Sequence, residues 1–251
     1  MRDGRDAESA VPHPPLPRSP FLIPGMSIGN SDRARNAILA RIRERQGRGA
    51  ASRPSQAERE AVETYIGRHP VGPLPPVEED LVERFRRRAE AMQSTTDAVA
   101  GMGDVPGAVA RYLRANGLAL AGCVWPRLAR LDWQAAGVQL EARAAEDRDL
   151  VGVTGVFAAL AETGTLMLVS GPDVPASVSL LPETHVAVVP AGRIVRHMED
   201  AWELARAELG RLPRMVNFIS GPSRTGDIDQ TIVVGAHGPY RVHMIVVRDT
   251  A

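Results

Sequence analysis

Short runs of apolar residues, separated by helix-like stretches, constrain the fold of this 251-residue chain more than any other feature of its sequence. From about residue 96 onward they predict strands at residues 118–124, 138–140, 151–153, 165–169, 185–189, 215–219, 232–234 and 242–247. Several runs are continuously apolar, as in strands that are covered on both faces. Helical patterns occupy residues 105–116 and 197–209. Strands that alternate with helices predict an α/β domain whose sheet is mostly parallel.

The first third of the chain differs in composition from this domain. Residues 1–30 hold six of the twenty prolines, which remove backbone donors and disfavour helix, and they predict a disordered or loosely docked tail. Residues 31–92 predict an arginine-rich helical extension, with one helix capped by Ser31 and another over residues 77–92. The remainder, residues 93–251, is the predicted α/β domain.

The charges of the chain exclude several classes of function. Its 30 basic and 30 acidic residues cancel, so neither nucleic acid nor an anionic membrane is an expected partner. All 30 basic residues are arginine, and the absence of lysine excludes a Schiff-base nucleophile and a P-loop. The arginines within residues 84–88 could bind phosphate, but Glu83 and Glu90 flank them, and we interpret the run as a solvated face.

Cysteine and histidine usage bears on metal sites and on location. Cys123 is the only cysteine, which excludes an internal disulfide framework and any all-cysteine zinc or iron–sulfur site within this chain. The histidines are not spaced as a metal cluster, so no metal site is expected. No stretch predicts a membrane span, and the N-terminal residues do not resemble a secretory signal, so we expect a cytoplasmic protein.

Three loops at predicted strand ends carry the candidate site residues, because α/β sheets place ligands at strand ends. The first loop, residues 161–165, contains Glu162, Thr163 and Gly164 directly before an apolar strand. Glycine permits a close approach of backbone, and the carboxylate of Glu162 could act as a nucleophile or general base. Alternatively, this glutamate caps a turn through backbone amides.

The second loop, residues 219–227, is denser in polar groups. Its candidate ligand contacts are Ser220, Gly221, Ser223, Arg224, Thr225 and Asp227. Small residues leave amides accessible, hydroxyls add donors, and the guanidinium of Arg224 presents a planar fork to a carboxylate or phosphate. We favour an anion cradle over the alternative of a capped turn in which Arg224 pairs with an aspartate.

The third loop, residues 235–239, is a turn between two predicted strands. His237 could donate or take a proton near neutral pH, and Gly238 would leave room for a ligand beside it. The alternative for this histidine is a hydrogen-bonded spacer in a Gly-Pro turn, and the residues alone leave both interpretations open.

The motifs in and around these loops, taken in order, resemble the lactate-utilisation protein C family, also called the LUD domain and formerly DUF162. The matching segments are residues 152–155, 161–165, 170–172, 180–185, 188–190, 193–195, 219–228 and 235–239. Each piece is short, but their joint order is specific, and the resemblance extends over roughly residues 95–248.

The resemblance implies both a fold and a role. The implied fold is an open three-layer α/β/α sandwich, similar to the sugar-phosphate isomerase and CoA-transferase group, here with an N-terminal helical extension. The implied role is oxidation of L-lactate to pyruvate beside two partner proteins that carry iron–sulfur clusters, with no cofactor in this chain. In CoA-transferases of similar fold a glutamate attacks the acyl thioester, and Glu162-Thr163-Gly164 has the form of that motif.

Our leading hypothesis is an accessory subunit of a lactate-oxidising system that binds a small anionic metabolite through these loops. Arg224 would hold the anion, Ser223 and Thr225 would add hydrogen bonds, and His237 would shape the site or supply a proton. Two rivals remain open: a stand-alone CoA-transferase-like or phosphate-ester enzyme that uses Glu162, and a non-catalytic metabolite-binding scaffold or sensor.

Overall fold

The computed structural model describes residues 28–48, 53–77, 80–228 and 231–248. The chain divides into two compact units, Met1–Pro70 and Val71–Ala251, which are described separately. No helix in the described part of the chain is long and apolar enough to cross a membrane. The tail predicted for residues 1–30 lies outside the described residues, except that residues 28–30 begin the first helix.

The first unit contains two helices, α1 (Ile28–Arg45) and α2 (Gln56–Gly67). Because α1 begins before Ser31, that serine lies inside the helix and is not its cap. The start of α2 is fixed by a capping box: the Ser55 amide donates to Glu58 Oε2 over 2.8 Å, and Ser55 Oγ accepts from the Glu58 amide over 3.2 Å. The helical character predicted for the extension is present in both elements.

A six-stranded parallel sheet forms the centre of the second unit, in the order β1-β12-β7-β4-β2-β3. Its strands are β1 (Thr95–Val99), β2 (Ala121–Val124), β3 (Gln139–Ala142), β4 (Val151–Thr154), β7 (Thr184–Pro190) and β12 (Arg241–Val247). The two long strands, β7 and β12, pair along their full length and lie inside the sheet. The predicted α/β fold with a mostly parallel central sheet is confirmed.

One face of this sheet is covered by helix α4 (Val105–Ala115). Alternate residues of the long strands, including Val186, Val188, Ile245 and Val247, pack against its buried side chains. The short 3₁₀ segments η1 (Met102–Asp104) and η2 (Pro126–Leu128) lie in the connections on either side of α4 and β2. Continuous apolar runs in β7 and β12 thus reflect burial on both faces.

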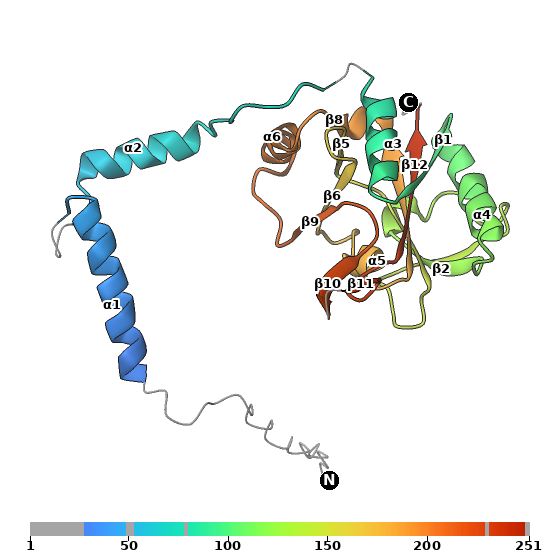
Figure 1. Ribbon diagram of the computed structural model, residues 1–251. Coiled ribbons are helices and arrows are strands. Elements are labelled where there is room, and N and C mark those ends of the chain that lie inside the picture. Colours follow the sequence, from blue (N-terminus) through green and yellow to red (C-terminus); the bar gives the residue numbers. More distant parts are fainter. Residues whose placement is uncertain (1–27, 49–52, 78–79, 229–230, 249–251) are drawn as a thin grey trace, which may run out of the picture. The chain divides into compact units, whose positions relative to one another are not determined.

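The other face carries a second, four-stranded sheet in the order β8-β5-β6-β9, together with α3 (Leu81–Ala91) and α5 (Ser177–Leu180). Its strands are β5 (Ala158–Leu160), β6 (Thr165–Val169), β8 (Ile194–Val195), which follows η3 (Ala191–Arg193), and β9 (Val216–Ile219). Helix α6 (Met198–Leu209) covers the far side of this small sheet. Figure 1 shows α4 and α6 at opposite sides of the unit, with both sheets between them.

A separate hairpin joins β10 (Arg224–Ile228) to β11 (Thr231–Val234). Helix α3 belongs to the core of the second unit, because Phe85 and Ala89 are fully buried against it. The sequence had grouped this helix with the extension of residues 31–92, whereas the compact unit begins at Val71. An apolar face of α3, hidden in an arginine-rich stretch, accounts for the difference.

Candidate functional site

A cavity of about 460 Å³ lies between helix α3 and the loops that follow β5 and β9. Its lining consists of Pro75, Arg84, Arg88, Ala91, Met92, Glu162, Thr163 and Ser220. Three of the predicted site residues, Glu162, Thr163 and Ser220, are therefore brought together. We call this space the α3 cavity.

Two glycines allow the loops to pack closely against α3. Gly164 has φ +70°, and a Cβ there would overlap the backbone of Ala89. Gly221 has φ +79°, and a Cβ there would overlap the carbonyl oxygen of Met92. Both positions need glycine for the left-handed backbone and for the close approach of the helix. The first two predicted loops thus meet at the C-terminal half of one helix.

Glu162 is held in place by a histidine that the sequence did not single out. His197 Nδ1 lies 3.0 Å from Glu162 Oε2, and the Glu162 amide donates to the Arg196 carbonyl over 3.0 Å. The histidine is the N-cap residue of α6 and is 7% exposed, and its amide donates to Asp200 Oδ2 over 3.0 Å. The only sequence signal for His197 is its position directly before a helical pattern, and that position indicates a helix cap and not a site residue.

A chain of hydroxyl groups runs from the first loop to the second. Thr163 Oγ1 donates to Thr165 Oγ1 over 2.7 Å, and Thr165 Oγ1 lies 2.8 Å from Ser220 Oγ. Thr165 is buried at the start of β6, so the exposed hydroxyls of Thr163 and Ser220 are linked through a fixed group. The chain ties the two loops together beside Glu162.

The cations of the α3 cavity come from α3 itself. Arg84 and Arg88 are one helical turn apart and therefore share a face. Arg88 is exposed, but Arg84 is only 8% exposed, so the interpretation of this arginine run as a solvated face is wrong for Arg84. The burial of a charged residue inside a cavity wall is a feature that charge patterning alone does not reveal.

The other predicted site residues belong to a neighbouring group around the hairpin. The Ser223 amide donates to the Pro239 carbonyl and the Gly235 amide to the Ser223 carbonyl, both over 2.8 Å. Gly238 packs beside Ser223, so the second and third predicted loops do meet.

The remaining members of that group differ in exposure. Arg224 and His237 are exposed, Thr225 is 9% exposed, and Asp227 lies in β10. Arg224 starts the hairpin and is not among the residues that line the α3 cavity. Its contact with the same ligand as Glu162 stays a prediction.

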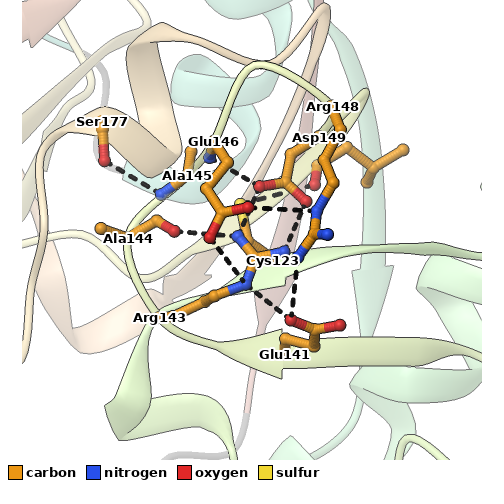
Figure 2. Close-up of polar contacts among 10 residues, drawn as sticks. Cys123, Glu141, Arg143, Ala144, Ala145, Glu146, Arg148, Asp149 and Ser177 are labelled. Atoms are coloured by element: carbon orange, nitrogen blue, oxygen red, sulfur yellow. Dashed lines mark hydrogen bonds and ion pairs between the residues drawn. The ribbon is translucent and has the colours of Figure 1, made fainter.

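A second cavity, of about 660 Å³, contains none of the predicted site residues. It lies beside β2 and β3, and Arg143 and Asp149 form part of its wall. Arg143 makes two bonds to Asp149, of 2.6 and 3.0 Å, and a third of 2.6 Å to Glu141 (Figure 2). The arginine lowers the pKa of the Asp149 carboxyl, whose side chain is 5% exposed. These bonds occupy the guanidinium, so Arg143 links Glu141 in β3 to Asp149 and stabilises the loop between β3 and β4. We call this set of contacts the Arg143 brace.

The thiol of Cys123 lies close to this brace (Figure 2). Burial and the nearby Asp149 raise the pKa of Cys123 to about 12. Within the described part of the chain, no group of three or more His, Cys, Asp or Glu side chains is arranged to hold a metal ion.

Comparison with known proteins gives three kinds of match. The LUD domain family model matches residues 125–247. Lactate utilization protein C of Bacillus subtilis (strain 168) is 39% identical over 121 residues, which cover 47% of this chain and 50% of that protein. The protein of the same name from Halalkalibacterium halodurans is 44% identical over 108 residues, covering 42% and 46%. The chain spans about half the length of the curated relatives it matches.

A solved structure shares the fold. The crystal structure of a DUF162 family protein from Deinococcus radiodurans aligns with a TM-score of 0.52 at 24% identity, covering 69% of this chain and 100% of that one. At this level of identity the likeness concerns the fold alone.

Proposed function

Because the LUD domain family model matches residues 125–247 of this chain, we propose that the protein takes part in lactate utilisation. Its role is that of a cytoplasmic accessory subunit in a system that oxidises L-lactate to pyruvate. The curated relatives of this domain are named for lactate utilisation, and the α3 cavity supplies a place for a small organic acid.

The observation that carries the proposal is the combination of charges around the α3 cavity. Two arginines, Arg84 and Arg88, and Ser220 line the same space as Glu162. Guanidinium groups and hydroxyls bind the carboxylate of an organic acid, while Glu162 can accept a hydrogen bond from another part of it. A cavity of this size is typical of small-molecule sites.

Iron–sulfur partner proteins complete the proposed system. Oxidation of lactate to pyruvate releases two electrons, which need an acceptor, and one cysteine cannot hold a cluster within this chain. In the proposed system the electrons pass to clusters in partner proteins, while this subunit binds the acid or a partner surface. The exposed side chain of Arg224, at the start of the hairpin, is available to either.

Reconstitution with the partner proteins tests the proposal. We expect Glu162→Gln and Arg88→Ala to lower lactate oxidation at least tenfold, because both remove a polar contact from the α3 cavity. Arg224→Ala tests the hairpin in the same assay. Glu203→Gln is the matched control, since Glu203 is an exposed residue of α6 that does not line the cavity. Oxidation that survives all three site substitutions would reject these assignments.

A second assay, turnover of acyl thioesters by the chain without partner proteins, separates the alternative functions. A stand-alone CoA-transferase-like enzyme would turn over acyl thioesters without redox partners and lose all activity in Glu162→Gln. The hydrogen bond from His197, which orients Glu162 in a cavity wall, is the observation that favours this alternative. A sensor would be stabilised by a metabolite and would show no turnover in either assay.

A further inference from the structure

The α3 cavity is asymmetric in its hydrogen-bonding groups. The arginines of α3 have only donors, whereas the loop after β5 contributes the carboxylate of Glu162. A ligand that satisfies both parts must present an acceptor to the arginines and a donor to Glu162. This requirement goes beyond a simple preference for anions.

Glu162 is fixed as an acceptor by its neighbours. An ionised carboxylate has no proton to give, so the contact of 3.0 Å between His197 Nδ1 and Glu162 Oε2 requires that the histidine donates. The Glu162 side chain is 26% exposed and lines the cavity, and the side chain of His197 behind it is 9% exposed. The free lone pairs of Glu162 therefore face a ligand, and they accept a hydrogen bond but do not give one.

Ser220 completes the donor side of the cavity. Thr163 donates to Thr165, and in the contact of 2.8 Å between Thr165 Oγ1 and Ser220 Oγ either hydroxyl can be the donor. Ser220 lines the cavity, and when Thr165 is the donor the proton of Ser220 is available to a ligand there. It joins Arg84 and Arg88 as a donor to an anionic group.

We propose that the α3 cavity selects 2-hydroxycarboxylates over the corresponding 2-oxo acids, an inference that rests on the proposed function. The carboxylate of the ligand binds to the arginines of α3 and to Ser220. The 2-hydroxyl donates a hydrogen bond to the carboxylate of Glu162, and His197 orients that carboxylate. His197 acts here as a positioning residue, because it contacts Glu162 and not the ligand.

The selectivity follows from the exchange of a hydroxyl for a ketone. The ketone oxygen of a 2-oxo acid is an acceptor and has no proton. It therefore cannot form a hydrogen bond with the carboxylate of Glu162, and the lone pairs of the two oxygens repel each other. A site that is built to accept a hydrogen bond from a hydroxyl discriminates against an analogue without one, because its own polar group is left unpaired. We expect a difference in affinity of about tenfold or more.

Calorimetric titration of the full chain with L-lactate, pyruvate and propionate measures this selectivity. The expected order of affinity is lactate first, propionate second and pyruvate last, since propionate lacks the hydrogen bond but brings no opposing lone pair. Glu162→Gln should bring lactate and pyruvate to within about twofold of each other, because an amide also offers a donor. Glu203→Gln should keep the wild-type ratio.

Two substitutions of His197 separate positioning from general stability. His197→Phe removes the donor to Glu162 and should reduce the lactate-to-pyruvate ratio, whereas His197→Asn retains a donor and should preserve most of it. The ratio compares two ligands on the same variant, so a loss of stability does not change it.

The outcomes distinguish this inference from the proposed function. Equal binding of lactate and pyruvate, or tighter binding of pyruvate, would overturn the selectivity while leaving an anion site in place. Binding of none of the three acids would overturn the anion site of the proposed function, and the selectivity with it. A wild-type ratio that persists in Glu162→Gln would exclude Glu162 as its source.

Discussion

Two of the buried histidines of the second unit, His185 and His243, each lie beside a threonine hydroxyl. His185 Nε2 lies 2.8 Å from Thr154 Oγ1, and His243 Nδ1 lies 2.8 Å from Thr95 Oγ1. Burial lowers the pKa of His185 to about 4, and it also lowers that of His243 to about 4, although Asp97 opposes the change there. The unfolded chain therefore takes up protons at these positions before the folded chain does.

Stability should consequently fall as the pH decreases from about 6.5 to about 4. In that window the unfolded state binds more protons, so acid favours unfolding, and each histidine contributes up to about 3 kcal/mol. Urea unfolding at half-unit intervals of pH measures the slope, and His185→Gln should reduce it because one titrating group is removed. A slope that is the same in wild type and variant would contradict the assignment to His185.

Cys123 should be inert in the folded protein. Its thiol is fully buried and its pKa is raised to about 12, so the reactive thiolate is scarce at neutral pH. We expect a chromogenic disulfide reagent at pH 8 to label the folded chain at least a hundredfold more slowly than the chain in guanidinium chloride. Rapid stoichiometric labelling without denaturant would show that the thiol is accessible.

The brace formed by Arg143 offers a direct comparison of two arginines. Arg143→Ala leaves the carboxylate of Asp149 buried without its main partner, and we expect a loss of about 3 kcal/mol in the free energy of unfolding. Arg148→Ala, at a side chain that is 68% exposed, should cost less than about 1 kcal/mol. Similar losses in the two variants, measured by urea unfolding, would mean that the brace carries no special stability.

Helix α3 packs against the loops that contain Gly164 and Gly221 and thereby fixes the position of the candidate site. Gly164 and Gly210 have similar backbone angles, φ +70° and +67°, but only Gly164 has the backbone of α3 against it. Gly164→Ala should therefore destabilise the protein by more than Gly210→Ala, which costs about 1 kcal/mol for backbone strain alone. Urea unfolding measures the loss of unfolding free energy in both variants. Equal losses would show that α3 shifts at this contact with little cost in stability.

The strands that the sequence predicted are runs of mainly apolar residues. Runs such as residues 185–189 and 242–247 coincide with β7 and β12 to within one residue at each end. In contrast, β1 and β10 were not predicted, because their sequences, TTDAV and RTGDI, are largely polar. Both are strands because of their neighbours: β1 lies at the edge beside β12, and β10 pairs with β11. Tertiary context of this kind is not visible in local composition.

The candidate site shows the same division. Glu162, Thr163 and Ser220 were found from the sequence because glycine and hydroxyl residues cluster around them. Arg84 and His197 were missed, because each lies in a helical pattern that has an ordinary structural explanation, a solvated face for one and a helix start for the other. Residues that lie more than sixty positions apart in the chain meet only through the packing of α3 on the small sheet.

The boundary of the second unit can be tested by truncation. Residues 71–251 contain all three apolar clusters, so this fragment should unfold cooperatively at a temperature within about 5 °C of the full chain. Removal of α3 in a fragment of residues 93–251 deletes the buried Phe85 and should lower the midpoint by roughly 10 °C or more. Thermal unfolding by circular dichroism distinguishes the two, and equal midpoints would place α3 outside the cooperative core.

Helix α3 precedes the segment that matches the family model, yet it supplies both arginines of the α3 cavity. The carboxylate and the hydroxyls come from inside the matched segment. Replacement of the eleven residues of this helix would therefore change both arginines of the candidate site and leave the matched segment unchanged. The ligand preference of the candidate site would then change through a segment that lies upstream of the matched domain.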